Sequence, residues 1–240
     1  MSRHLIRALL LLALAVAVPT HAADAKDAND AKDAHGYVNL FPADGVPAGW
    51  RVTEWSDVSK PAKEGVNWQV EDGVLHGSEP RGTWLVSQKT YGDFVLEFEF
   101  KLGERGNSGV GIRIPEAGDP AFDGLEIQMC DARYNNPPDT ADKLTGSLYW
   151  AVAPKEQVYK PVQWNKYQIT AKGANIKVVL NDVVVQDINL DDHKQPLQRH
   201  GGKPAPSLSQ RPRKGHIGFQ ELSRDGAHVT IRNARIKELE

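Results

Sequence analysis

The sequence predicts an all-β protein in which two antiparallel sheets form a sandwich or jelly roll. Short apolar segments with a period of two recur from Gly36 to the C-terminus, and no convincing amphipathic helix follows residue 35. Gly (21) and Pro (15) are frequent, and six residues each of Trp, Tyr and Phe suit strands better than a helical bundle. Because no composition break divides this stretch, we expect a single domain at residues 36–240.

The N-terminal segment has the features of a secretory signal peptide. Arg3 and Arg7 precede an apolar run, and Thr20-His21-Ala22 forms a small-residue cleavage site. The apolar run is shorter than the ~20 residues that a spanning helix needs, so we expect cleavage after residue 22, export to the periplasm or the outside, and no membrane span. Residues 23–35 repeat Ala, Asp, Lys and Asn and predict a flexible tether.

Clear alternation and turn signals predict the individual strands. In Phe94–Leu102 every even position is apolar, as in a strand with one buried side. Asp72-Gly73 separates two alternating segments within residues 68–76 and predicts a hairpin, since Asp-Gly tolerates positive φ. Asn181-Asp182 predicts a second hairpin within residues 176–185. Further strands are expected at 167–170, 218–220 and 229–232.

The charge balance and the motif content argue against several classes of function. With 29 Lys and Arg against 31 Asp and Glu, the formal charge of −2 offers no basic excess, so nucleic acid is not an expected partner. Cys130 is the only cysteine, so no internal disulfide forms. Phosphate loops, nucleophile elbows and zinc spacings are missing from the sequence, which therefore requires no cofactor; it does not indicate the oligomeric state.

Polar side chains gather on two neighbouring segments in the middle of the chain. Alternation places Asn107 and Arg113 on one face of residues 106–114, with small residues between them that leave room for a ligand. Glu126 and Gln128 share a face of the next segment. A solvated outer face, or a simple Glu126–Arg113 ion pair, is the alternative interpretation.

We expect this face to bind a ligand, with an aromatic platform beside it. The residues expected to bind substrate are Asn107, Ser108, Gln128, Asp131, Tyr149, Trp150 and Gln220. Two polar loops, 133–143 and 191–214, are expected to border the binding face. Among the histidines, His216 is the best candidate for proton transfer because glycines surround it, although a structural role fits equally; His193 and His200 are expected to be solvated loop residues.

Seven segments together resemble a known family, the 3-keto-disaccharide hydrolase or 3-keto-glucoside lyase/hydratase domain, formerly a domain of unknown function. They are Gly49-Trp50, residues 68–75, Tyr91-Gly92-Asp93-Phe94, Gly106-Asn107-Ser108-Gly109, Leu125-Glu126-Ile127-Gln128, residues 145–149 and residues 231–237. The resemblance runs from about Tyr37 to the C-terminus and implies a concanavalin A-like jelly roll. Relatives commonly carry a histidine just after a Gly-x-Gln near the end, where this chain has Gln220-Glu221-Leu222.

The resemblance implies cleavage of a glycoside whose sugar has been oxidised to a ketone at C3. The ketone acidifies the C2 proton, so a base removes it and the enolate expels the group on C1, without the carboxylate pair of ordinary glycosidases. We assign Glu126 as the base, Arg113 or a divalent cation as the enolate stabiliser, and His216 as the acid. A cation held by Glu126 and Asp131 is left open, since no spacing demands one.

Two other functions compete with a secreted 3-keto-glycoside lyase or hydratase. A lectin-like module would bind glycans on the same jelly roll without reacting them. A structural envelope protein would use the polar face to dock a partner. Replacement of Glu126 distinguishes the enzyme from the lectin-like module, because catalysis depends on this residue more strongly than simple binding does.

Overall fold

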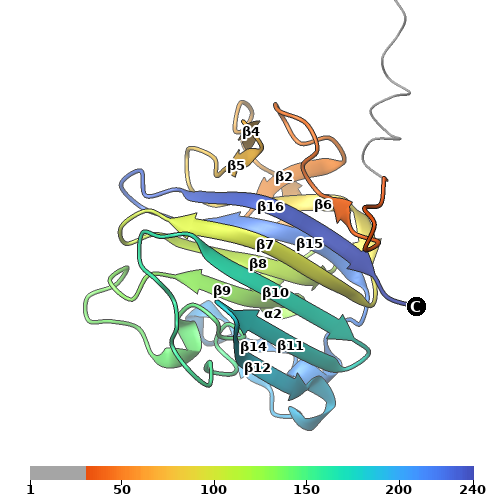
Figure 1. Ribbon diagram of the computed structural model, residues 1–240. Coiled ribbons are helices and arrows are strands. Elements are labelled where there is room, and N and C mark those ends of the chain that lie inside the picture. Colours follow the sequence, from red (N-terminus) through yellow and green to blue (C-terminus); the bar gives the residue numbers. More distant parts are fainter. Residues whose placement is uncertain (1–30) are drawn as a thin grey trace, which may run out of the picture.

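The computed structural model describes residues 31–240, so the expected signal peptide and most of the tether lie outside the described residues. Two antiparallel sheets pack face to face into a jelly-roll sandwich, which confirms the predicted fold class (Figure 1). Within residues 31–240, no helix has the length and apolar character needed to cross a membrane.

The first layer is an eight-stranded sheet with the order β12-β11-β10-β7-β16-β5-β4, in which β1 also pairs with β16. Its strands are β1 (Val38–Asn39), β4 (Gln69–Glu71), β5 (Val74–His76), β7 (Phe94–Leu102), β10 (Asn165–Lys172), β11 (Asn175–Leu180), β12 (Val183–Asn189) and β16 (Val229–Glu238). The long strand β7 has the bounds that alternation predicts.

The second layer is a six-stranded sheet with the order β3-β2-β6-β15-β8-β9. Its strands are β2 (Trp50–Glu54), β3 (Asp57–Pro61), β6 (Thr83–Tyr91), β8 (Asn107–Ile114), β9 (Leu125–Cys130) and β15 (Gly215–Glu221). In Figure 1 this layer lies behind β7, β10 and β16.

Both predicted hairpins form, and their turns have the backbone that their sequences favour. Asp72 (φ 50°) and Gly73 (φ 71°) connect β4 to β5, and Asn181 (φ 49°) and Asp182 (φ 68°) connect β11 to β12. Positive φ at both central residues is the type I′ geometry that matches the twist of paired strands.

The core lies between the two sheets. Phe98 of β7 and Phe219 of β15 meet edge to face, with ring centroids 5.3 Å apart, so one aromatic pair links the layers. Phe100 and Tyr167 stack at 5.0 Å beside them, and Trp68 is fully buried. Such pairs add stability beyond the area they bury.

The outer face of the eight-stranded sheet carries paired charges. Arg235 contacts Glu97 at 2.7 Å, and Arg232 contacts Glu99 at 2.7 Å. Asp33, from the end of the expected tether, lies 3.4 Å from Arg235 and accepts hydrogen bonds from the backbone of His35 and Tyr37. Residues 31–35 therefore turn against the domain.

Short elements gather beside the outer face of the six-stranded sheet. They are α2 (Pro120–Asp123), η1 (Ala141–Lys143), η3 (His200–Gly202) and the small hairpin of β13 (Leu197–Gln198) and β14 (Pro204–Ala205). The remaining 3₁₀ turns, η2 (Leu190–Asp192) and η4 (Leu208–Gln210), contact each other, and Leu208 packs into the core. Phe122 of α2 packs with Ala205 of β14, and Tyr149 and Trp150 border this cluster. These elements build walls around part of the sheet.

Candidate functional site

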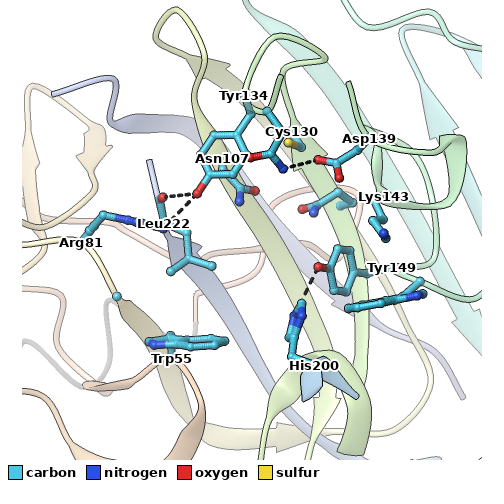
Figure 2. A pocket seen from close by; sticks show the side chains of 14 residues that line it. Trp55, Arg81, Asn107, Cys130, Tyr134, Asp139, Lys143, Tyr149, His200 and Leu222 are labelled. Atoms are coloured by element: carbon cyan, nitrogen blue, oxygen red, sulfur yellow. Dashed lines mark hydrogen bonds between the residues drawn. The ribbon is translucent and has the colours of Figure 1, made fainter. Parts of the chain in front are cut away.

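A cavity of about 520 Å³ lies over β8 and β9, on the face of the six-stranded sheet that points away from the core (Figure 2). This volume is within the range of small-molecule sites. Its floor contains Asn107, Gln128 and Cys130. Its walls are formed by Trp55, Arg81, Gly82, Tyr134, Asn135, Asp139, Lys143, Tyr149, Trp150, His200 and Leu222. A narrow recess of about 20 Å³ shares several of these residues and adds Asp119, Ala121, Glu126 and Gln220.

The register of β8 and β9 explains how the floor forms. Asn107 pairs with Cys130, Gly109 with Gln128, and Gly111 with Glu126. The face predicted by alternation is therefore confirmed for Asn107, Glu126 and Gln128. A Cβ at Gly109 would lie 2.0 Å from the Glu126 Oε1 atom, so this glycine makes room for the carboxyl group.

Glu126 is 2% exposed, and its Oε1 atom has no hydrogen-bond partner in the described part of the chain. Burial, with a smaller contribution from the charge of Asp119, raises the pKa of Glu126 well above its ordinary value. A buried carboxylate without a cation or donors is costly, so burial favours the neutral acid over the carboxylate. In the neutral form the carboxyl group can donate a hydrogen bond.

Amide side chains complete the floor. The Gln128 Oε1 atom accepts a hydrogen bond from the Met129 N–H at 2.9 Å, which leaves the amide NH₂ as a donor for a ligand. The buried Asn107 Oδ1 atom has no partner among residues 31–240 and offers an acceptor. Gln220 of β15 lines the recess. The floor is polar and provides both donors and acceptors.

Aromatic side chains form facing walls. Figure 2 shows Trp55, from the turn between β2 and β3, on one side and Tyr149 on the other. Trp55 is 36% exposed and Lys143 lies 4.5 Å from the centroid of the Trp150 ring. Flat apolar walls over a polar floor suit the faces and hydroxyls of a sugar ring.

His200 lies in the long loop and is exposed, as the sequence predicted, and it also lines the cavity. Its Nε2 atom lies 3.3 Å from the Tyr149 hydroxyl, and its ring centroid lies 4.7 Å from that of Trp150. Partial burial, together with the charge of Lys143, lowers the pKa of His200, so the imidazole is neutral at pH 7. This histidine lines both the cavity and the recess.

Asp119 is a second carboxyl group beside the recess that sequence analysis missed. Its Oδ1 atom accepts a hydrogen bond from the Ala121 N–H at 3.0 Å and caps α2. Burial and, more weakly, Asp123 raise the pKa of Asp119 to about 6 against the lowering effect of this hydrogen bond. The capping hydrogen bond to Ala121 explains why the Asp119 carboxyl group lies beside the recess.

Two residues assigned to catalysis on the sequence do not line the cavity or the recess. Arg113 lies at a bulge where the β15 pairing shifts; its φ is 52°, and its guanidinium contacts the Gly173 carbonyl at 2.7 Å and Asp93 at 3.2 Å. His216 contacts Glu116 through Nε2 at 2.8 Å. One extra residue in β8 turns Arg113 away from the face that strict alternation predicts.

Two expected substrate-binding residues are also engaged elsewhere. Ser108 is fully buried and donates to the Gln220 carbonyl at 2.6 Å. Asp131 forms an ion pair with Arg133 at 2.8 Å and does not line the cavity. Within residues 31–240, no group of three or more His, Cys, Asp or Glu side chains is arranged to hold a metal ion; Glu126 lines the recess, and Asp131 is paired with Arg133.

Both loops that were expected to border the binding face contribute residues to the cavity. Residues 133–143 contribute Tyr134, Asn135, Asp139 and Lys143, and residues 191–214 contribute His200. Trp55 was missed; the available signal is a tryptophan in a polar turn, where no core requires it.

A jelly roll with a polar, aromatic-walled cavity on one outer face is an architecture that many carbohydrate-binding sandwich proteins share. Comparison with family models narrows the class: residues 36–237 match the 3-keto-alpha-glucoside-1,2-lyase-like domain, and the chain belongs to this family. A protein from Bacteroides thetaiotaomicron named 3-keto-disaccharide hydrolase is 26% identical over 242 residues, which cover 87% of this chain and 80% of that protein.

Solved structures support the same fold. Two are from Parabacteroides distasonis and are provisionally described as glycosyl hydrolases. One has a TM-score of 0.68 at 23% identity and covers 85% of this chain and 99% of its own. The other has a TM-score of 0.66 at 26% identity and covers 86% of this chain and 96% of its own.

Proposed function

We propose that this protein is an exported enzyme that cleaves 3-keto-glycosides by removing the C2 proton and eliminating the group on C1, hydrates the resulting 3-keto-2-hydroxy-glucal, or does both. The observation that carries the proposal is the buried, unpaired Glu126 beneath a sugar-sized cavity with aromatic walls. Family membership and the name of the Bacteroides relative support the 3-keto substrate class.

Elimination through an enolate requires a hydrogen-bond donor near the sugar oxygen that becomes negatively charged. When the C2–H bond breaks, its electrons form an enolate whose charge lies on the C3 oxygen; the enolate then collapses, restores the ketone, forms C1=C2 and expels the C1 oxygen. A neutral carboxylic acid in an apolar setting is an effective donor to such an oxygen. Glu126 takes this role with Gln128 beside it, which differs from the base role assigned from the sequence, because burial and the charge of Asp119 both raise the pKa of Glu126 and no cation pairs with it among residues 31–240.

The substrate class is tested by offering matched pairs of sugars. We expect the purified protein to convert 3-keto-trehalose, 3-keto-sucrose and aryl 3-keto-glucosides, with products identified by mass spectrometry, and to leave the unoxidised sugars intact. Loss of deuterium from C2 to solvent should accompany cleavage. Binding of both series without turnover would instead support the lectin-like alternative, and hydrolysis of unoxidised sugars would refute the enolate route.

A further inference from the structure

Tyr149 and His200 meet at the rim of the cavity, about fifty residues apart in sequence. The Tyr149 hydroxyl and the His200 Nε2 atom are 3.3 Å apart (Figure 2). Both residues also line the recess that contains Glu126. In the tautomer of neutral His200 that carries its proton on Nδ1, Nε2 is the acceptor and the Tyr149 hydroxyl donates to it. The pair faces the same small volume as the acid on the floor.

The histidine is held in place on two sides. Phe122 meets its ring at 89° with centroids 5.4 Å apart, and Trp150 lies 4.7 Å away. The preceding residue, Arg199, forms two hydrogen bonds with Asp123 of α2, at 2.8 and 2.5 Å. A bidentate pair of this kind fixes orientation as well as distance, so the loop carrying His200 is anchored beside the cavity.

We propose that Tyr149 and His200 act together as the base that removes the C2 proton of a 3-keto sugar in this cavity. The inference rests on the proposed function and adds the proton acceptor that it lacks. The C2 proton passes to the Tyr149 oxygen while the Tyr149 proton passes to His200 Nε2, and the C–H electron pair enters the enolate. The imidazolium then returns the proton through Tyr149 to the departing C1 oxygen.

The other candidate acceptors are less suitable. His216 is occupied by Glu116 at 2.8 Å and lines neither cavity nor recess. Asp119 uses one carboxyl oxygen to cap α2. Glu126 lies on the floor, and burial raises its pKa, which favours a proton that can be donated to the C3 oxygen, whereas the Tyr149–His200 pair retains an acceptor.

Deuterium exchange into a sugar without a leaving group isolates this step. The probe is 3-keto-1,5-anhydroglucitol, which carries hydrogen at C1 and therefore exchanges C2–H without cleavage; NMR in D₂O follows the exchange. We expect Tyr149→Phe and His200→Gln to slow it by about 10²-fold or more, as loss of a positioned base does. His193→Gln is the matched control, since His193 lies in the same loop and lines neither cavity.

Chemical rescue separates proton transfer from a structural role. His200 is exposed at the rim, so added imidazole should restore exchange to His200→Ala and leave Tyr149→Phe unchanged. Exchange at the wild-type rate in Tyr149→Phe and His200→Gln would overturn the base assignment, and so would a folded His200→Ala that imidazole does not rescue. In either case, cleavage of 3-keto sugars by the wild-type protein would still support the proposed function. A wild-type protein that neither exchanges nor cleaves 3-keto sugars overturns both.

Discussion

Two carboxyl groups on strands, one on each sheet, are both buried yet have opposite environments. Glu97 of β7 is 8% exposed; burial alone would raise its pKa, but hydrogen bonds from Gln168 and Arg235 and the charge of Arg235 lower it. Glu126 of β9 is 2% exposed and has only burial and Asp119 as influences, both of which raise its pKa. The partners of Glu97 stabilise its carboxylate form, whereas burial of Glu126 favours its protonated form. Such a perturbed pKa in a cavity is typical of functional sites.

The surroundings of the two groups follow the same contrast. On the eight-stranded sheet, charged neighbours fill the outer face, and Trp164 packs against Arg232 with 4.1 Å between guanidinium and ring. On the six-stranded sheet, glycine at 109 leaves space and Trp55 is open to the cavity. A hollow of about 640 Å³ also lies on the first face, but the carboxylates that line it, Glu97 and Glu99, are already paired with arginines. In the second face the carboxyl group of Glu126 has no such partner among residues 31–240.

The largest expected effect comes from filling the space beside Glu126. Gly109→Ala places a Cβ 2.0 Å from Oε1 and must displace the carboxyl group, so we expect 3-keto-glycoside cleavage to fall by about 10²-fold or more. Gly92→Ala is the control, because its Cβ meets nothing within 4 Å. Steady-state kinetics on both proteins measure the effect; an active Gly109→Ala with Glu126 in place would contradict the assigned site.

Glu126→Gln distinguishes a donor from a base. The amide still donates a hydrogen bond to the C3 oxygen, so we expect a loss of roughly 10-fold, against about 10²-fold for Glu126→Ala. In the wild type, activity should fall as pH rises through the raised pKa of Glu126, and this alkaline limb should be missing from Glu126→Gln. A loss of about 10³-fold in Glu126→Gln would restore the base role predicted from the sequence.

Removing an aromatic wall should weaken binding more than chemistry. Trp55→Ala deletes a surface on which a sugar stacks, so KM should rise by roughly 10-fold while kcat changes little. Trp164→Ala removes a tryptophan from the opposite sheet and should leave KM unchanged. Equal effects of the two variants would show that Trp55 acts through stability.

Local patterns predicted the fold and the floor of the site. The period-two run of Phe94–Leu102 and the turns at Asp72-Gly73 and Asn181-Asp182 are decided by neighbouring residues, so the sequence sufficed. The same parity placed Asn107, Gln128 and Glu126 on one face. Where the backbone keeps its alternation, side-chain direction follows from sequence.

The sequence analysis did not predict side-chain positions that depend on contacts between residues distant in the sequence. One extra residue in β8 against β15 moved Arg113 off the expected face, and periodicity carries no sign of such a bulge. His200 reaches the cavity because Arg199 is paired with Asp123, 76 residues away. The polarity of loop 191–214 correctly indicated an exposed His200, but only the folded chain shows that this exposed side chain also lines the cavity.

The pH dependence of stability should have opposite signs for the two carboxyl groups. Because the folded-state pKa of Glu97 is lowered, its contribution is present above the unfolded pKa and is lost as pH falls through the folded pKa. Glu97→Gln should therefore cost about 1–3 kcal/mol at neutral pH, and the cost should shrink in acid.

For Glu126 the folded-state pKa is raised, so the folded protein binds more protons and loses stability as pH rises above the ordinary value of 4.5. Glu126→Gln lacks this loss, and its stability relative to the wild type should increase with pH, by up to ~1.4 kcal/mol per pH unit until the folded pKa is reached. Urea unfolding of both variants and the wild type from pH 4 to pH 8 measures the two slopes. If the Glu126→Gln difference stays flat or decreases with pH, the carboxyl group is ionised in the free protein, and the contrast between the two sheets does not hold.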